Sequence, residues 1–199
     1  PLAERIAAHP EDAWLRRAFL SARGSESAII LTTLLSDHPT ISMVPALTDL
    51  ARYVAARGDA GELAAVLGGL DGPPDAIHCA VVTGISEGLR RSSLKQKTLA
   101  ALLADPPEGL APSLSKLEGV LAAAHTIALD AALPEAERLA ALPLLSSLAL
   151  EEKSELVAAL LHVSVPPTVQ SAAARLLAGS DRKAMAEFFF TRWNQLPPP

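Results

Sequence analysis

A repeat of 32 residues in the last third of the chain constrains the fold more than any other feature. Pro134, Pro166 and Pro198 recur at this spacing. The residues that match at equal offsets are Ala140, Ala141, Leu144 and Leu145 in the first copy and Ala172, Ala173, Leu176 and Leu177 in the second. Similarity at a fixed period of this size is typical of proteins built from stacked helical pairs.

The second copy shows how one unit is built. Pro166 is tolerated at a helix start, and the apolar residues after it follow helical spacing. Residues 179–181 (Gly-Ser-Asp) break this helix, and a second helix begins after them. Its apolar side carries Met185, Phe188, Phe189, Trp193 and Leu196. Since Phe188, Phe189 and Phe190 are consecutive, we expect one of them to be exposed or to cover a terminal edge, which makes the last helix a candidate contact surface.

Helical patterns with short breaks also fill the preceding residues, where no strand is expected. The predicted helices begin at Asp12, at Ser27, at Pro45 (ending at Gly58), after Asp59, at Asp75 (ending near Arg91), at Lys95 (ending at Ala104) and near Leu110. Pro143 should kink its helix near Leu139. Short connections make successive helices antiparallel. The sequence therefore predicts one all-α domain over residues 1–199, with about eleven helices.

Residues near the first predicted helix resemble the first helix of a HEAT repeat, in which an acidic cap and an arginine flank a bulky apolar residue. They are Asp12, Trp14, Leu15, Arg16 and Arg17. HEAT repeats usually have about 40 to 47 residues, so the period of 32 indicates a HEAT-like α-solenoid.

Gly84 and Gly88 lie four residues apart on the apolar side of the helix that begins at Asp75. We interpret them as the place where a neighbouring helix approaches closely. The same segment, Gly84-Ile85-Ser86-Glu87-Gly88, matches the G-x-S-x-G pattern of serine hydrolases, which needs a strand before the serine and a tight turn at it. Ser86 therefore remains a remote catalytic alternative.

Charge and cysteine content restrict the classes of site. The net charge of −5 argues against binding to nucleic acid. Arg90, Arg91, Lys95 and Lys97 form a basic cluster, interpreted as a solvated turn with polyanion binding as the alternative. The one cysteine, Cys79, rules out an internal disulfide or a cysteine-based metal site within the chain. No apolar run reaches the roughly 18 residues of a membrane span.

The other chemical motifs have structural explanations. Ser92 with Lys95 and Ser113 with Lys116 match S-x-x-K without the further elements of a β-lactamase-type site. The five histidines are isolated and lack the spacing of a helical metal site; they are His9, His38, His78, His125 and His162. We therefore assign no catalytic, cofactor-binding or metal-binding residue and expect no small-molecule ligand.

Four segments extend the resemblance. Residues Glu11 to Ala18, Leu50 to Asp59, Gly84 to Leu89 and Pro134 to Leu139 resemble, in this order, the helical middle region of large exported planctomycete-type proteins. Those proteins are membrane-bound dehydrogenase-like, with a β-propeller before the helices and a c-type haem domain after them. Their haem-attachment motif, Cys-x-x-Cys-His, is not found here. The resemblance implies a periplasmic or exported spacer between redox domains.

These observations lead to one functional prediction. The start at Pro1 without Met and the closing prolines indicate a part of a larger multidomain protein. We expect a non-catalytic scaffold, interdomain spacer or protein-interaction module, whose partners are flanking domains of the same chain or another protein. Nucleic-acid or polyanion binding is the alternative, and hydrolysis through Ser86 is a remote one.

Overall fold

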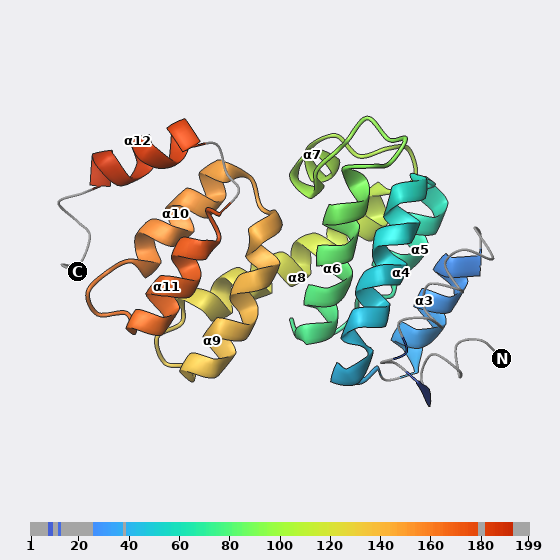
Figure 1. The fold of residues 1–199 in the computed structure, drawn as a ribbon, viewed down its shortest axis with the longest axis horizontal. Coiled ribbons are helices and arrows are strands. Elements are labelled where there is room, and N and C mark those ends of the chain that lie inside the picture. The colour runs from blue at the N-terminus through green and yellow to red at the C-terminus, as the bar shows by residue number, and fades with distance from the viewer. Residues whose placement is uncertain (1–7, 10–11, 13–25, 38, 179–181, 193–199) are drawn as a thin grey trace. The chain divides into compact units, whose positions relative to one another are not determined.

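The computed structural model of the chain describes residues 8–9, 12, 26–37, 39–178 and 182–192, and every regular element within these ranges is helical (Figure 1). The elements are α3 (Glu26–Ser36), η1 (Ile41–Met43), α4 (Val44–Arg57), α5 (Ala60–Gly68), α6 (Ala76–Leu89), α7 (Leu99–Ala104), α8 (Ala111–Leu129), α9 (Glu135–Ala141), η2 (Leu142–Ser147), α10 (Leu150–Leu160), α11 (Pro167–Arg175) and α12 (Arg182–Arg192). The predicted all-α class is confirmed. The helix predicted to begin at Asp12 falls, after Asp12 itself, outside the described residues. Trp14, His38 and Trp193 also lie outside them.

The chain divides into two compact units, residues 1–120 and residues 121–199. In the first unit, α4 and α6 pack side by side and form the most extensive helix pair (Figure 1). Large apolar side chains of the two helices are almost fully buried; they include Leu47, Leu50, Val54, Val81, Ile85 and Leu89. Burying each such side chain stabilises the fold by roughly 1.5 to 3 kcal/mol.

The ends of these helices agree with the capping residues in the sequence. Gly58 ends α4 in the left-handed conformation, with φ of 72°. Asp59 begins α5 by accepting a hydrogen bond from the Glu62 N–H, and Asp75 begins α6 by accepting from two backbone N–H groups. Side-chain caps of this kind satisfy the unpaired N–H groups of the first helical turn. The predicted starts after Asp59 and at Asp75 are therefore confirmed.

The predicted helix from Lys95 to Ala104 is wrong over its first half, because α7 begins at Leu99. The Thr98 hydroxyl caps this helix by accepting from the Ala101 N–H at 3.1 Å. Upstream, the Lys97 ammonium donates to the Ser92 carbonyl at 2.5 Å, and the Gln96 amide donates to the Asp105 carbonyl at 2.6 Å. These hydrogen bonds, between residues five and nine positions apart, hold residues 92–97 in an irregular loop.

The helix type changes at Pro143, the residue expected to kink its helix near Leu139. Helix α9 ends at Ala141, and the chain continues as the 3-10 segment η2, with Pro143 in its first turn. Proline lacks the N–H that would donate to the carbonyl of Leu139, and its ring crowds that carbonyl. The tighter 3-10 turn relieves both conflicts at the same point in the chain.

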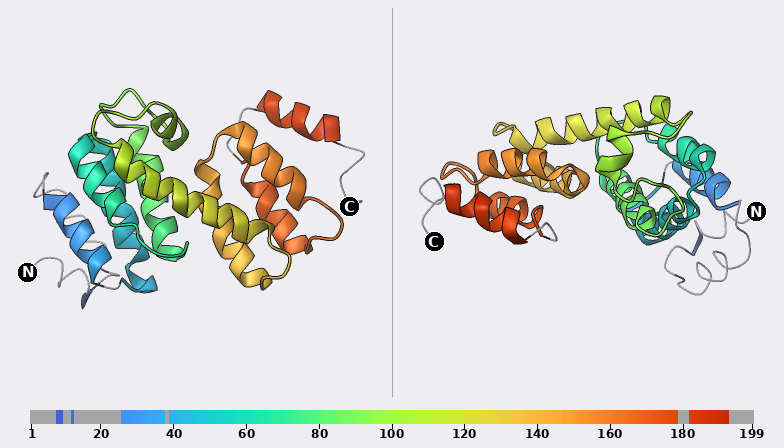
Figure 2. Two further views of the ribbon diagram at one scale, coloured as in Figure 1. Left: turned by 180° about the vertical axis from the view of Figure 1, so that it is seen from behind. Right: turned by 90° about the horizontal axis from the view of Figure 1, so that it is seen from above.

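The 32-residue repeat is visible in the burial of the second unit. Three of the four matched pairs are buried in both copies: Ala141 with Ala173, Leu144 with Leu176 and Leu145 with Leu177. The fourth pair differs, because Ala140 is exposed and Ala172 is half-buried. Helix α11 packs against both α9 and α10 (Figure 2). The matching residues therefore mark equivalent core positions.

Helices α9 and α11, which begin the two copies, lie with their N-termini together. The Thr168 hydroxyl at the start of α11 donates to the Glu135 carboxylate at the start of α9. The residues three positions beyond Glu135 and Pro167 also have equivalent roles: Arg138 donates to the Ala128 carbonyl at 3.0 Å, and Gln170 donates to the His162 carbonyl at 3.0 Å. Each copy thus ties its first helix to the segment before it.

Candidate functional site

The two glycines of α6 are the closest point of contact with α4. A Cβ added at Gly84 would collide with the Thr48 carbonyl and lie 2.8 Å from the Ala51 Cβ. At Gly88 it would collide with the Arg52 carbonyl and lie 2.7 Å from the Ala55 Cβ. Glycines four apart on α6 therefore face alanines four apart on α4. The predicted close approach of a neighbouring helix is confirmed.

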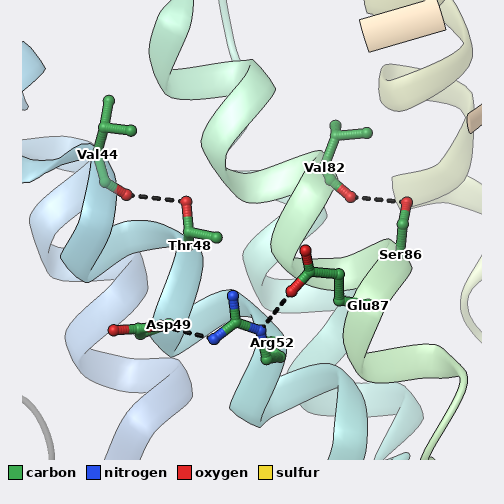
Figure 3. Close-up of polar contacts among 7 residues, drawn as sticks. All are labelled: Val44, Thr48, Asp49, Arg52, Val82, Ser86 and Glu87. Atoms are coloured by element: carbon green, nitrogen blue, oxygen red, sulfur yellow. Dashed lines mark hydrogen bonds and ion pairs between the residues drawn. The ribbon is translucent and has the colours of Figure 1, made fainter. Parts of the chain in front are cut away.

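Ser86 lies between these glycines, in the middle of α6 (Figure 3). Its hydroxyl donates to the Val82 carbonyl one turn earlier at 2.8 Å. Thr48 on α4 makes the same kind of bond to the Val44 carbonyl at 2.9 Å. A nucleophile elbow holds its serine at a sharp turn between a strand and a helix, whereas Ser86 has helical residues on both sides. The geometry gives Ser86 the ordinary role of a helical serine.

A charged group joins the same two helices next to the glycines. The Arg52 guanidinium on α4 donates to the Glu87 carboxylate on α6 at 2.6 Å and to the Asp49 carboxylate on its own helix at 2.7 Å (Figure 3). The Arg52 and Glu87 side chains are more than one-third exposed, and Asp49 is 30 % exposed. Ion pairs with this exposure to solvent add little to stability. The Arg52–Glu87 pair is the contact that links α4 to α6 beside the glycines.

The two S-x-x-K pairs do not form serine–lysine sites. Ser92 is buried and donates to the Leu89 carbonyl at 2.9 Å, while Lys95 contacts Asp105 at 3.3 Å. Lys116 donates to the Gly68 carbonyl, the last residue of α5, at 2.8 Å and pairs with Asp71 at 2.9 Å. Lys95 thus binds the residue that follows α7, and Lys116 binds the C-terminal end of α5.

The basic cluster is divided between bound and unbound cations. Lys95 and Lys97 are occupied by Asp105 and by the Ser92 carbonyl. Arg90 and Arg91 are exposed, and neither forms an ion pair with another described residue. Two of the four cations thus have partners among the described residues, and polyanion binding stays an alternative.

His78 is the one histidine that the described structure buries. Its ring Nδ1 lies 2.7 Å from the Asp75 carboxylate, and its Nε2 has no hydrogen-bond partner among the described residues. Burial alone would raise the pKa of Asp75. Hydrogen bonds from the His78 N–H and ring, together with the charge of His78 and a hydrogen bond from the Ile77 N–H, have the larger combined effect, and the pKa of Asp75 is lowered overall. A pocket of about 270 Å³ adjoins this pair; besides Asp75 and His78 it is lined by Leu35, Pro39, Gly69, Leu70, Asp71 and Ile77.

A second hollow lies in the other unit, between α9 and α11. It has a volume of about 430 Å³ and is lined by Leu139, Pro167, Thr168, Ser171, Ala172 and Arg175. We call it the α9–α11 groove. Ser171 and Arg175 are exposed, and neither has a hydrogen-bond or ion-pair partner among the described residues. The groove therefore combines an apolar floor with polar groups that remain available.

Large apolar side chains are exposed in both units. Phe190 is 85 % exposed, whereas Phe188 is buried and stacks edge-on against Phe189 with ring centres 5.2 Å apart. The prediction that one of the three consecutive phenylalanines is exposed is confirmed. The other strongly exposed apolar residues are Ile29, Ile41 and Val163.

Sequence reasoning missed the groove and the ties made by Arg138 and Gln170. The sequence did contain a signal for both. Gln170 follows Arg138 by the repeat period of 32 residues, and Arg175 lies outside the apolar stripe of α11. What the sequence lacked was the register of α9 against α11, which the Thr168–Glu135 contact shows.

Comparison of the chain with protein-family models, curated proteins and solved structures finds no match. The resemblance to the helical region of exported redox proteins thus stays a prediction. In the described part of the chain, no group of three or more histidine, cysteine, aspartate or glutamate side chains is arranged to hold a metal ion. None of the described helices has the length and hydropathy of a membrane span.

Proposed function

We propose that this chain is a HEAT-like helical scaffold that holds other protein domains, in the manner of the periplasmic or exported spacer that its sequence resembles. The supporting observation is the equivalence of the two copies in the second unit. Three of their four matched residue pairs are buried in both copies, and their first helices lie with N-termini together. In a solenoid, each helical pair buries its neighbour's exposed side and leaves an extended surface for binding.

The polar side chains support the same proposal, because those with functional motifs are used inside the fold. Ser86, Ser92 and Lys116 all bind backbone carbonyls, and Asp75 caps a helix. Exposed apolar side chains, by contrast, occur where a partner could cover them, as at Phe190 and Ile41. A protein with this distribution of groups binds through its surface.

The proposal is tested by cross-linking the protein in its own cells with a lysine-reactive reagent, followed by mass spectrometry. Lys95 and Lys183 are exposed reporters in the first and second units. A scaffold gives reproducible cross-links from at least one of them to a single polypeptide outside residues 1–199, either in the same gene product or in a second protein. Cross-links confined to residues 1–199 would contradict the proposal.

A further inference from the structure

The α9–α11 groove carries charges of opposite sign at its two ends. At the Thr168 end lies the Glu135 carboxylate, one of whose oxygens accepts the Thr168 hydroxyl. At the other end is Arg175, in the last turn of α11, where the helix dipole favours a cation. Between them, Leu139 and Ala172 form an apolar floor. The groove is therefore dipolar along its length.

The length of the groove sets the size of what it can hold. Arg175 lies seven positions after Thr168, and a helix rises about 1.5 Å per residue, so the two ends are about 10 Å apart. An extended peptide advances about 3.3 Å per residue and covers that distance with about three residues. A short stretch of extended chain therefore matches the length of the groove along α11.

We propose that the α9–α11 groove binds an extended segment of a partner protein, in which an acidic side chain pairs with Arg175 and a basic side chain two to four residues away pairs with Glu135. Small apolar residues between them cover Leu139 and Ala172. The Arg175 guanidinium presents a planar fork of donors that suits a carboxylate. The proposal rests on the scaffold function and names the partner chemistry of one surface.

The charge pattern favours a peptide over a nucleic acid. A phosphate backbone carries one sign of charge along its whole length and would meet the Glu135 carboxylate at one end of the groove. A peptide with both signs of charge satisfies both ends. The apolar floor also suits aliphatic side chains better than a sugar–phosphate chain.

The experiment is a selection from a phage-displayed library of random linear peptides on the immobilised chain. We expect enriched peptides to contain aspartate or glutamate and, two to four residues away, lysine or arginine. On the Arg175→Glu variant, the acidic position should change to a basic one. The matched control is Arg91→Glu, which makes the same charge change at an exposed arginine of the first unit and should select the original peptides.

Fluorescence polarisation with one enriched peptide then measures the affinity. We expect Arg175→Glu to weaken binding about tenfold or more, Ser171→Trp to abolish it by filling the groove, and Arg91→Glu to leave it unchanged. Circular dichroism checks that each variant is folded. Enrichment of the same peptides by both arginine variants, or no enrichment at all, would overturn the proposal.

Failure here is distinguishable from failure of the scaffold function. If cells give cross-links to a partner but the library gives no dipolar peptides, the groove is not the binding surface and the scaffold proposal stands. If neither experiment gives a partner, both proposals fail.

Discussion

At the scale of single residues, the glycines of α6 matter because of what their missing side chains allow. Gly84→Ala would place a Cβ against the Thr48 carbonyl and the Ala51 Cβ, and these atoms belong to a helix that cannot shift independently. Overpacking of this kind costs about 1 to 3 kcal/mol, which exceeds the gain of about 1 kcal/mol in helix propensity. We expect urea unfolding to show a net destabilisation, with the midpoint displaced to lower urea.

Gly119→Ala provides the matched control for this change. Gly119 also lies inside a helix, α8, but a Cβ there meets no atom within 4 Å. We expect this variant to be more stable by up to about 1 kcal/mol, because only the propensity gain applies. If the two alanine variants shift the unfolding midpoint in the same direction, close helix contact is not the reason for Gly84.

Asp75 should make stability depend on pH in the acid range. Its pKa is lowered in the folded protein, so its carboxylate stabilises the fold at pH values above its unfolded pKa of about 3.9. This contribution is lost as the pH falls through the lower folded pKa. Asp75→Asn keeps an acceptor for the helix cap but removes the charge that attracts His78. We expect the stability difference between wild type and this variant to shrink below about pH 4, measured by thermal unfolding between pH 2 and 7.

Asp75→Ala separates the cap from the charge. It should cost about 1 kcal/mol relative to Asp75→Asn at every pH, since it also removes the acceptor for the Ile77 and His78 N–H groups. A wild-type stability that runs parallel to that of Asp75→Asn from pH 7 to 2 would contradict the role given to the carboxylate.

At the scale of helices, local sequence predicted the elements whose ends are set by local contacts. The ends of α4 and the starts of α5 and α6 followed from Gly58, Asp59 and Asp75, each of which acts within a few residues. The start of α7 did not follow, because residues 92–97 are held by Asp105, which comes later in the chain. Hydrogen bonds that span a loop leave no periodic signal in the sequence.

Arg138 should be important for the end of α8. Its side chain is buried and donates to the carbonyl of Ala128, one of the final carbonyls that no helical N–H can satisfy. We expect Arg138→Met to destabilise the fold by about 2 kcal/mol, since it removes a charged hydrogen bond and leaves that carbonyl unpaired. Chemical unfolding of the purified chain measures this value.

Two further variants test whether Arg138 acts as a hydrogen-bond donor. Arg138→Gln should lose less than Arg138→Met, because Gln170 makes the equivalent bond in the second copy of the repeat. Arg175→Met, at an exposed arginine, should change stability by less than about 0.5 kcal/mol. Equal losses for the methionine and glutamine variants at 138 would assign the effect to packing alone.

At the scale of the whole molecule, the candidate groove shows what a repeat can and cannot reveal. The period of 32 residues makes Glu135 equivalent to Pro167 in the sequence, and it therefore implies that α9 and α11 begin at equivalent points of the two copies. It does not show that the two helices leave a hollow between them, because that depends on the small side chains of Ser171 and Ala172 meeting Leu139. The equivalent starts of the two helices can thus be predicted from the sequence, whereas the groove between them can be found only from the packed helices.

The two compact units should also open separately. Leu47 in α4 and Leu177 after α11 are both fully buried, and replacing either by alanine should cost about 2 to 5 kcal/mol. We expect native-state hydrogen exchange to show faster exchange in α4 and α6 for Leu47→Ala and in α10 and α11 for Leu177→Ala. The physical reason is that local opening exposes only the contacts of one unit. A uniform increase in all helices for either variant would instead show one cooperative core, and it would contradict the independence that a repeat array allows its parts.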